Sequence, residues 1–398
     1  MTSPIPKFNS PSSTSPYQSP LICWEPITTP EEPYTPLQAP MTILSKGTMP
    51  PDELAAFSNQ NPLRTLKSPL LSSPVFLSPT QALSITPFGI DPTGPLKAIK
   101  TEGTNSSYEW FLKLRQREVR KRSDKVVMPA FPPHATPFTE VVVGCFIKVC
   151  LEKLGISYCE VPPIAYIQIG HPSVLAENSR EFPQSARGTG SAQKLIKNVQ
   201  SISLDDLRNH SIEQKIHPFA LEVLAVLDIT LLNCDRNVQN ILIKPDRSIV
   251  VIDHSYTLPI GDEDTWRIKA FWQTLPIIKQ QPSEKICDFI RNLDLFCLPT
   301  IAHVLENEVE ESLGKLPPHQ KANEEQSLKP ERILPHQIAI CFLKMAILEQ
   351  SKTLEEVAKK LSKPSSNIVK DVYRAITQPL DPQTMEQTIR KHLLLRSD

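Results

Sequence analysis

The pattern of apolar and polar positions in the first half of the chain predicts short strands around one helix. Strand-like runs at 84–86 and 96–99 flank the turn sequence 91–94, which favours a β-hairpin. A helical pattern follows over 139–154, and the apolar run 161–169 then predicts a buried strand.

The second half of the chain has a more helical pattern. A helix is predicted over 218–227, a strand hairpin over 241–252, and mainly helices from there to the C-terminus. We therefore expect an α+β fold of two lobes, with a small mixed lobe over 81–189 and a larger helical lobe over 190–398.

The first 80 residues differ from the rest in composition. They contain 16 of the 40 prolines and a single glycine, with abundant Ser and Thr. Such a composition cannot bury enough apolar surface to fold alone. We expect residues 1–80 to be a disordered, extended arm, which serves either as a tether or as a carrier of short motifs that bind a partner.

Charge and cysteine content narrow the class of protein. The 43 basic and 43 acidic side chains cancel, so a nucleic-acid partner is not expected. The eight cysteines and nine histidines show no metal-binding spacing. No apolar stretch has membrane-spanning length, and no signal-peptide pattern is found, so we expect a cytoplasmic protein. Secretion by a non-classical route, which needs no signal peptide, is the alternative.

The hairpin at 241–252 carries polar residues at one end. If its turn is 245–248, Lys244 pairs with Ile249, and the same register places Asn240 opposite Asp253. The two oxygen-bearing side chains would then lie together.

These residue types suit a magnesium site. Mg²⁺ prefers a few oxygen ligands and leaves other positions to water and phosphates, a role that fits Asn240 and Asp253. Asp235 lies five residues before Asn240, where a carboxylate can accept a proton from an attacking hydroxyl. The alternative is a polar hairpin end with Asx-type turns and no ligand.

Short segments around these residues, taken in order, resemble the phosphatidylinositol 3-/4-kinase family. The similarity is closest to its type II members and the plant-type gamma 4-kinases, and it extends over about 82–375. The matching segments are 161–163, 190–195, 227–229, 233–236, 240–242, 252–259, 271–272, 292–294 and a helix expected to begin near Pro335.

The resemblance implies a two-lobed kinase-like fold that uses ATP and Mg²⁺. Asp235 and Arg236 would belong to the catalytic loop, and Asn240 and Asp253 would bind the metal. The γ-phosphoryl group would pass to an inositol lipid. A protein Ser or Thr hydroxyl is an alternative acceptor, and a catalytically inactive pseudokinase scaffold is the non-enzymatic alternative.

The resemblance also implies four residues that bind the nucleotide. Lys100 would contact the phosphates and pair with Glu140 on the following helix, with Lys97 as the competing lysine. Gln193 and Leu195 lie where the family places the strand that leads into the adenine-binding hinge.

Two departures from the family pattern bear on activity. The loop 79–84 has no glycine that would let backbone amides approach phosphates. Asn237 stands where many relatives have histidine. Because Asp235, Asn240 and Asp253 are all present, we expect an active enzyme.

Two further segments have competing interpretations. The basic segment 113–125 is either a charged helix on the surface or a contact with anionic membrane lipids. The segment 354–372 resembles a helix-turn-helix, which makes DNA binding the alternative function of a different class. The neutral net charge argues against DNA binding, and the segment also fits a helical hairpin that closes the large lobe.

Overall fold

The computed structural model contains both helices and strands. It describes residues 83–87, 96–102, 106–114, 136–169, 188–208, 211–259, 268–313 and 330–362, and also residues 384, 387, 388, 390 and 391. The predicted arm at 1–80 and its boundary lie outside the described residues.

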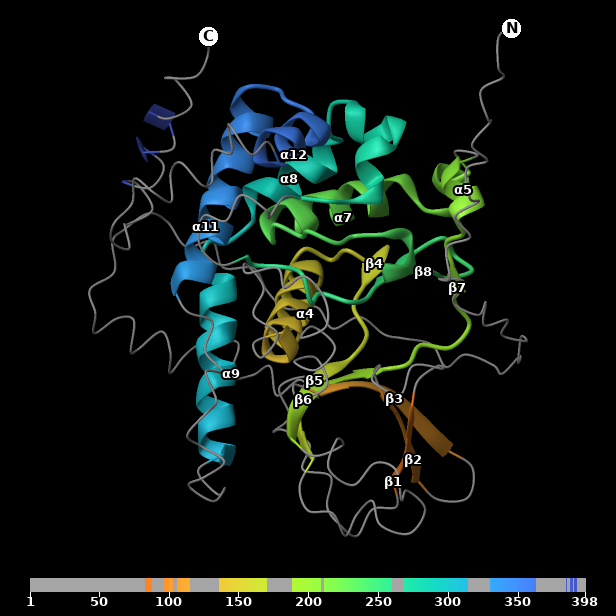
Figure 1. The fold of residues 1–398 in the computed structure, drawn as a ribbon. Helices are drawn as coiled ribbons and strands as arrows, with labels where there is room; N and C mark the ends of the chain where they lie inside the picture. The colour runs from red at the N-terminus through yellow and green to blue at the C-terminus, as the bar shows by residue number, and fades with distance from the viewer. Residues whose placement is uncertain are drawn as a thin grey trace, which may run out of the picture. The chain divides into compact units, whose positions relative to one another are not determined.

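A five-stranded antiparallel sheet is the first main feature (Figure 1). Its strands, in spatial order, are β1 (Leu83–Pro87), β2 (Leu96–Glu102), β3 (Ser106–Leu114), β6 (Gly188–Lys194) and β5 (Ile164–Ile169). The pairing of Ile85 with Ala98 confirms the predicted first hairpin. The lobe boundary predicted between 189 and 190 falls inside β6, which pairs with both β3 and β5.

Helix α4 (Thr136–Lys153) packs on β5 and β6. It begins three residues before the predicted start at 139, because Pro137 is tolerated in a first turn. Gly144 allows the close approach of helix and sheet, since a Cβ there would lie 2.8 Å from Cγ2 of Ile164. Residues 161–163, predicted as strand, precede β5; two of them are prolines, which lack the N–H that a strand ladder uses.

A second, four-stranded sheet carries the polar hairpin. Its spatial order is β4 (Cys159–Glu160), β9 (Ile249–Val251), β8 (Ile241–Ile243) and β7 (Gln200–Ser201). Strands β8 and β9 form the hairpin predicted over 241–252, and β4 pairs with β9 in parallel.

Helix α7 (Pro218–Thr230) lies in the core, with residues 220–230 all buried. A helix that is apolar on all sides belongs in a core, and α7 contacts α8, α11 and α12. It continues three residues past the predicted end at 227. The other helical elements are α5 (Leu204–Arg208), α6 (Ile212–Lys215), η2 (Val238–Asn240), η3 (Phe271–Thr274), η4 (Pro276–Lys279), α8 (Glu284–Arg291), α9 (Cys297–Leu313), α11 (Pro330–Lys344), η5 (Met345–Glu349) and α12 (Leu354–Ser362).

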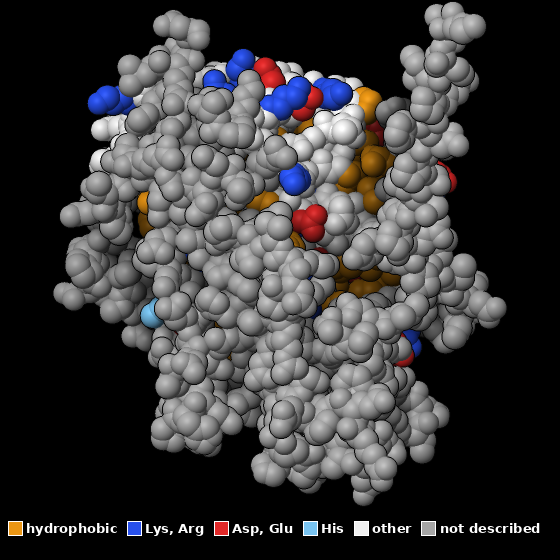
Figure 2. Space-filling view, in the orientation of Figure 1, with side chains coloured by type: hydrophobic (Ala, Val, Ile, Leu, Met, Phe, Trp, Pro, Cys, Tyr) orange, Lys and Arg blue, Asp and Glu red, His pale blue; other side chains and the backbone are white. Residues whose placement is uncertain are grey.

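Two of these helices bear on earlier predictions. Helix α11 begins at Pro330, and Pro335 lies inside it rather than at its start. Helix α12 covers the first part of the proposed helix-turn-helix, and the remainder lies outside the described residues. On α12, Lys359 forms an ion pair with Glu355. In Figure 2, basic side chains (blue) and acidic side chains (red) lie side by side along the upper edge of the face that is shown.

None of the helices within the described ranges is both long enough and apolar enough to cross a membrane.

Candidate active site

The hairpin turn closes one residue earlier than predicted. Lys244 lies opposite Ser248, to which its N–H donates at 2.9 Å, so the predicted pair of Lys244 and Ile249 is wrong. The loop has three residues, with Arg247 in the left-handed region at φ 67°. Asp246 holds the turn by accepting from the N–H of Ser248 at 2.9 Å. Three-residue hairpin loops are a common alternative to the four-residue loop predicted at 245–248.

The register shift changes how the site end of the hairpin is built. Asn240 lies opposite Ile252, whose N–H donates to Asn240 O at 3.1 Å, so the predicted pair of Asn240 and Asp253 is wrong. Asp253 follows with a φ of 54°, an uncommon conformation for a non-glycine residue. Asn240 Nδ2 donates to Asp235 O at 2.8 Å. The hairpin end and the loop that carries Asp235 are therefore joined.

Arg236 is a buried connector between this loop and the hairpin. Its Nε lies 3.1 Å from Asp228 Oδ1, and its Nη1 donates to the carbonyl oxygens of Ile252 at 2.7 Å and Asn240 at 3.3 Å. Its Nη2 lies 3.2 Å from His254 Nδ1. Arg236 is fully buried, and its contacts join the loop to α7 and to the hairpin.

Asp228 on α7 anchors Arg236, and sequence reasoning missed it. Its carboxylate also accepts from Trp272 Nε1 at 2.8 Å and from Asn233 Nδ2 at 2.9 Å. Burial raises the pKa of Asp228, and the Arg236 charge opposes that shift. Asp228 and Glu222 are the two acidic residues in a mainly apolar helix, and such residues were the signal available in the sequence.

Lys113 on β3 is the lysine that pairs with Glu140. Its Nζ lies 2.9 Å from Glu140 Oε1, 2.8 Å from Asp253 Oδ1 and 3.0 Å from Ser255 Oγ. The pairing expected for Lys100 stays a prediction, because its side chain lies outside the described residues. The sequence pattern did not predict β3 as a third strand, so Lys113 was not a candidate for the pairing with Glu140.

Two other predictions for this region are affected. The side chains of Lys100 and Lys97, both on β2, lie outside the described residues. Lys113 belongs to the basic segment 113–125, for which either a charged surface helix or a contact with anionic lipids was predicted. It is buried among protein groups instead, and 115–125 lies outside the described residues.

The Lys113 cluster favours an ionised, reachable Asp253. Burial alone would lower the pKa of Lys113, but the charges of Asp253 and Glu140 raise it above its usual value. Burial raises the pKa of Glu140 against the effect of Lys113. Burial would also raise the pKa of Asp253, but Lys113 holds it well below its usual value. The Asp253 side chain is 38% exposed and that of Glu140 is 2% exposed, so a ligand can reach Asp253.

The donor set at the hairpin end fits a hard cation. Asn240 uses Nδ2 for the loop, which leaves its Oδ1 as the atom that can serve a metal, and the carboxylate of Asp253 follows the strand that pairs with β8. Within the described ranges, no group of three His, Cys, Asp or Glu side chains is arranged to hold a metal. A cation at this site would therefore take its remaining ligands from phosphates and water.

Asp235 is half-buried at the end of the loop. Burial raises its pKa, and a hydrogen bond from Asn237 Nδ2 at 3.3 Å opposes the shift. Asn233 Oδ1 accepts from the Asp235 N–H at 2.9 Å, which fixes the backbone there. A carboxylate with a raised pKa is better suited to accept a proton than an ordinary surface aspartate. Asn237 thus contacts Asp235 directly.

The structure places Gln193 on the same strand face as the Lys113 cluster. Gln193 pairs with Phe111 in the sheet, and two residues before it Ser191 Oγ donates to Glu140 Oε2 at 3.1 Å. Gln193 is buried, and its Nε2 has no hydrogen-bond partner among the residues that the structure describes. Leu195 follows β6, with its N–H donating to a carbonyl oxygen of β3.

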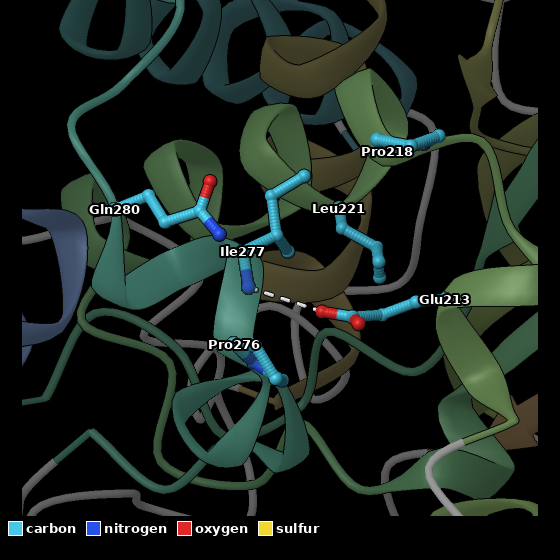
Figure 3. A pocket seen from close by; sticks show the side chains of 6 residues that line it. All are labelled: Glu213, Pro218, Leu221, Pro276, Ile277 and Gln280. Atoms are coloured by element: carbon cyan, nitrogen blue, oxygen red, sulfur yellow. Dashed lines mark hydrogen bonds between the residues drawn. The ribbon is translucent and has the colours of Figure 1, made fainter.

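A separate pocket of about 190 Å³ lies between α6, α7 and η4 (Figure 3). It is lined by Glu213, Pro218, Leu221, Pro276, Ile277 and Gln280. Its single ionisable group, Glu213, accepts from the Ile277 N–H at 3.0 Å. Because this carboxylate stabilises the backbone, the pocket offers less chemistry than the hairpin end, and it contains none of the predicted site residues.

Comparisons with known proteins give partial matches. Phosphatidylinositol 4-kinase gamma 3 of Arabidopsis thaliana is 29% identical over 142 residues, which are 34% of this chain and 23% of that protein. Phosphatidylinositol 4-kinase gamma 4 of the same plant is 32% identical over 148 residues, 36% of this chain and 23% of that protein. The relationship to kinases is distant. No family model matches the chain, and the matched region spans less than a quarter of either relative.

Proposed function

We propose that the protein is an ATP- and Mg²⁺-dependent phosphotransferase of the phosphatidylinositol 3-/4-kinase-like type, with a two-lobed kinase-like fold. The observation that carries this proposal is the position of Lys113, within 3 Å of both Glu140 and Asp253. A lysine held by one buried carboxylate beside a metal-binding aspartate is the arrangement that kinases use for nucleotide phosphates. The partial similarity to two plant 4-kinases supports the same class.

The proposed roles follow from the contacts at the site. Asn240 and Asp253 would hold Mg²⁺, which supplies neutralisation of phosphate charge when it is bound. Lys113 would bind phosphate oxygens while Glu140 keeps its ammonium in place. Asp235 would accept the proton of the attacking hydroxyl, and Arg236 would hold the loop against the hairpin.

An inositol lipid is the proposed acceptor, because the sequence resemblance and the names of both relatives agree on it. The experiment is incubation of the full chain with labelled ATP and Mg²⁺, with phosphatidylinositol vesicles in one arm and purified proteins in the other. Label in the lipid supports the proposal, and label only in protein makes the chain a protein kinase. Absence of label in both, together with absence of Mg²⁺–ATP binding, contradicts it.

A further inference from the structure

Arg332, in the first turns of α11, is buried among neutral acceptors. Its Nε donates to Leu258 O at 2.8 Å, its Nη2 to Thr257 O at 3.2 Å and its Nη1 to Thr139 Oγ1 at 2.5 Å. Arg332 is 3% exposed, and within the described ranges no carboxylate pairs with it.

A buried guanidinium that has no carboxylate partner among the described residues is costly, so the position of Arg332 calls for an explanation. Burial lowers the pKa of Arg332 to about 9. The planar fork of arginine can bind several acceptors in fixed directions at once, which lysine cannot do. A side chain that serves only to fill space on α11 would not need this geometry.

The acceptors of Arg332 belong to the two elements that carry the site. Thr139 precedes Glu140 on α4, and Thr257 and Leu258 lie a few residues after Asp253. Those two carboxylates bind the same ammonium, that of Lys113. Arg332 thus makes a second link between the same two elements, from the side of α11.

We propose that Arg332 is a positioning residue that fixes the Glu140-bearing helix relative to the Asp253-bearing segment. If either element moves, Arg332 loses acceptors and Lys113 loses one of its carboxylates. The link itself is a property of the fold, and its effect on turnover rests on the proposed phosphotransferase function.

The test compares Arg332→Lys and Thr139→Val with His336→Phe in the full chain. His336 is a matched control because it is also buried on α11 and bonds a backbone carbonyl, Thr230 O at 2.7 Å, but this carbonyl belongs to α7. Phenylalanine retains the aromatic contact that His336 makes with Phe146. Thr139→Val removes the hydroxyl on α4 that accepts from Arg332. It tests the same link if the Arg332→Lys variant fails to fold.

Hydrogen exchange measures the link without any assay of activity. Arg332→Lys is expected to raise exchange about tenfold in both 140–143, which excludes the Phe146 that His336 contacts, and 254–258, since buried hydrogen bonds are lost. Thr139→Val is expected to raise it by less, and His336→Phe to leave both segments as in the parent. Equal exchange in parent and Arg332→Lys, or the same increase in His336→Phe, overturns the proposal.

Turnover gives the second readout. Arg332→Lys is expected to raise the Mg²⁺ concentration for half-maximal turnover several-fold, whereas His336→Phe leaves it unchanged. An unchanged Mg²⁺ dependence in Arg332→Lys, despite altered exchange, overturns the effect on the site. If the parent shows no turnover, the proposed function fails, and the exchange experiment still decides whether Arg332 links the two elements.

Discussion

At the scale of single residues, the site depends on one ammonium group shared by two carboxylates. Lys113 and Glu140 are almost fully buried, whereas Asp253 is partly exposed. With all three ionised, the cluster has a net negative charge and its exposed member is the candidate metal ligand. A cation that binds Asp253 would offset this negative charge, and it would leave Lys113 held by Glu140.

Asp253→Ala is expected to abolish the rise in unfolding temperature that Mg²⁺ and ATP together produce, while the protein still folds. The response is lost because the proposed metal ligand is removed. The protein still folds because a partly exposed side chain at a hairpin end contributes little packing. A thermal-shift titration measures this. Asp246→Ala, at the other end of the same hairpin, is the control and should keep the response. An unchanged response in Asp253→Ala would remove this residue from the site.

Lys113→Met is expected to lower the free energy of unfolding by about 3–5 kcal/mol, because it leaves Glu140 buried without its partner. The double variant Lys113→Met/Glu140→Gln should recover part of that loss, since the uncompensated charge is gone. Urea unfolding measures both. If the double variant is as unstable as the sum of the single variants, the two residues are not coupled.

Local sequence patterns were enough to predict the polar residues at the hairpin end, but they did not predict the role of Lys113. Asp235, Asn240 and Asp253 lie within one short segment, so their spacing could be read directly. The partners of Lys113 lie 27 and 140 positions away along the chain, and only the sheet and α4 bring them together. The basic residues that follow β3 also concealed its strand character.

At the scale of elements, α4 and α11 position the groups around the site. The structure confirms the helices predicted at 139–154 and 218–227, which are α4 and α7. They could be predicted from the sequence because their apolar patterns are long and continuous. The hairpin register could not be fixed from the sequence, because loops of three and four residues differ only in local backbone conformation.

Gly144→Ala is expected to lower the free energy of unfolding by about 1–3 kcal/mol, because the new Cβ would lie 2.8 Å from Cγ2 of Ile164 in a packed interface. The loss should appear as a lower urea midpoint. Since α4 carries Glu140, a weaker response to Mg²⁺ and ATP should accompany it. A midpoint equal to that of the parent would contradict the close approach of α4 to β5.

The packing of α11 on α7 predicts a dependence of stability on pH. Burial lowers the pKa of His336 to about 4, so this side chain stays neutral when folded while an unfolded histidine takes up a proton near pH 6.5. Stability should therefore fall as the pH drops from about 6.5 to about 4, by up to about 1.4 kcal/mol per pH unit for one proton. Urea unfolding across this range should show a shallower slope for His336→Phe. An identical slope would contradict a buried, neutral His336.

At the scale of the whole molecule, the proposed site draws on both sheets and on α4. Lys113 lies in the five-stranded sheet and Glu140 on α4. Asn240 and Asp253 both lie at the end of the hairpin that is away from its turn, in the second sheet. The function is therefore expected to require the folded body of the chain rather than any single motif.

The most direct test of phosphotransfer is turnover of Asp235→Asn beside its nucleotide affinity, measured on phosphatidylinositol vesicles with Mg²⁺ and ATP. The substitution keeps the size of the side chain and removes the charge that accepts a proton. We predict that the parent labels the lipid, that turnover falls by about 10² in the variant, and that nucleotide affinity is nearly unchanged. Equal turnover in parent and variant, or an inactive parent, would contradict the proposed catalytic role of Asp235.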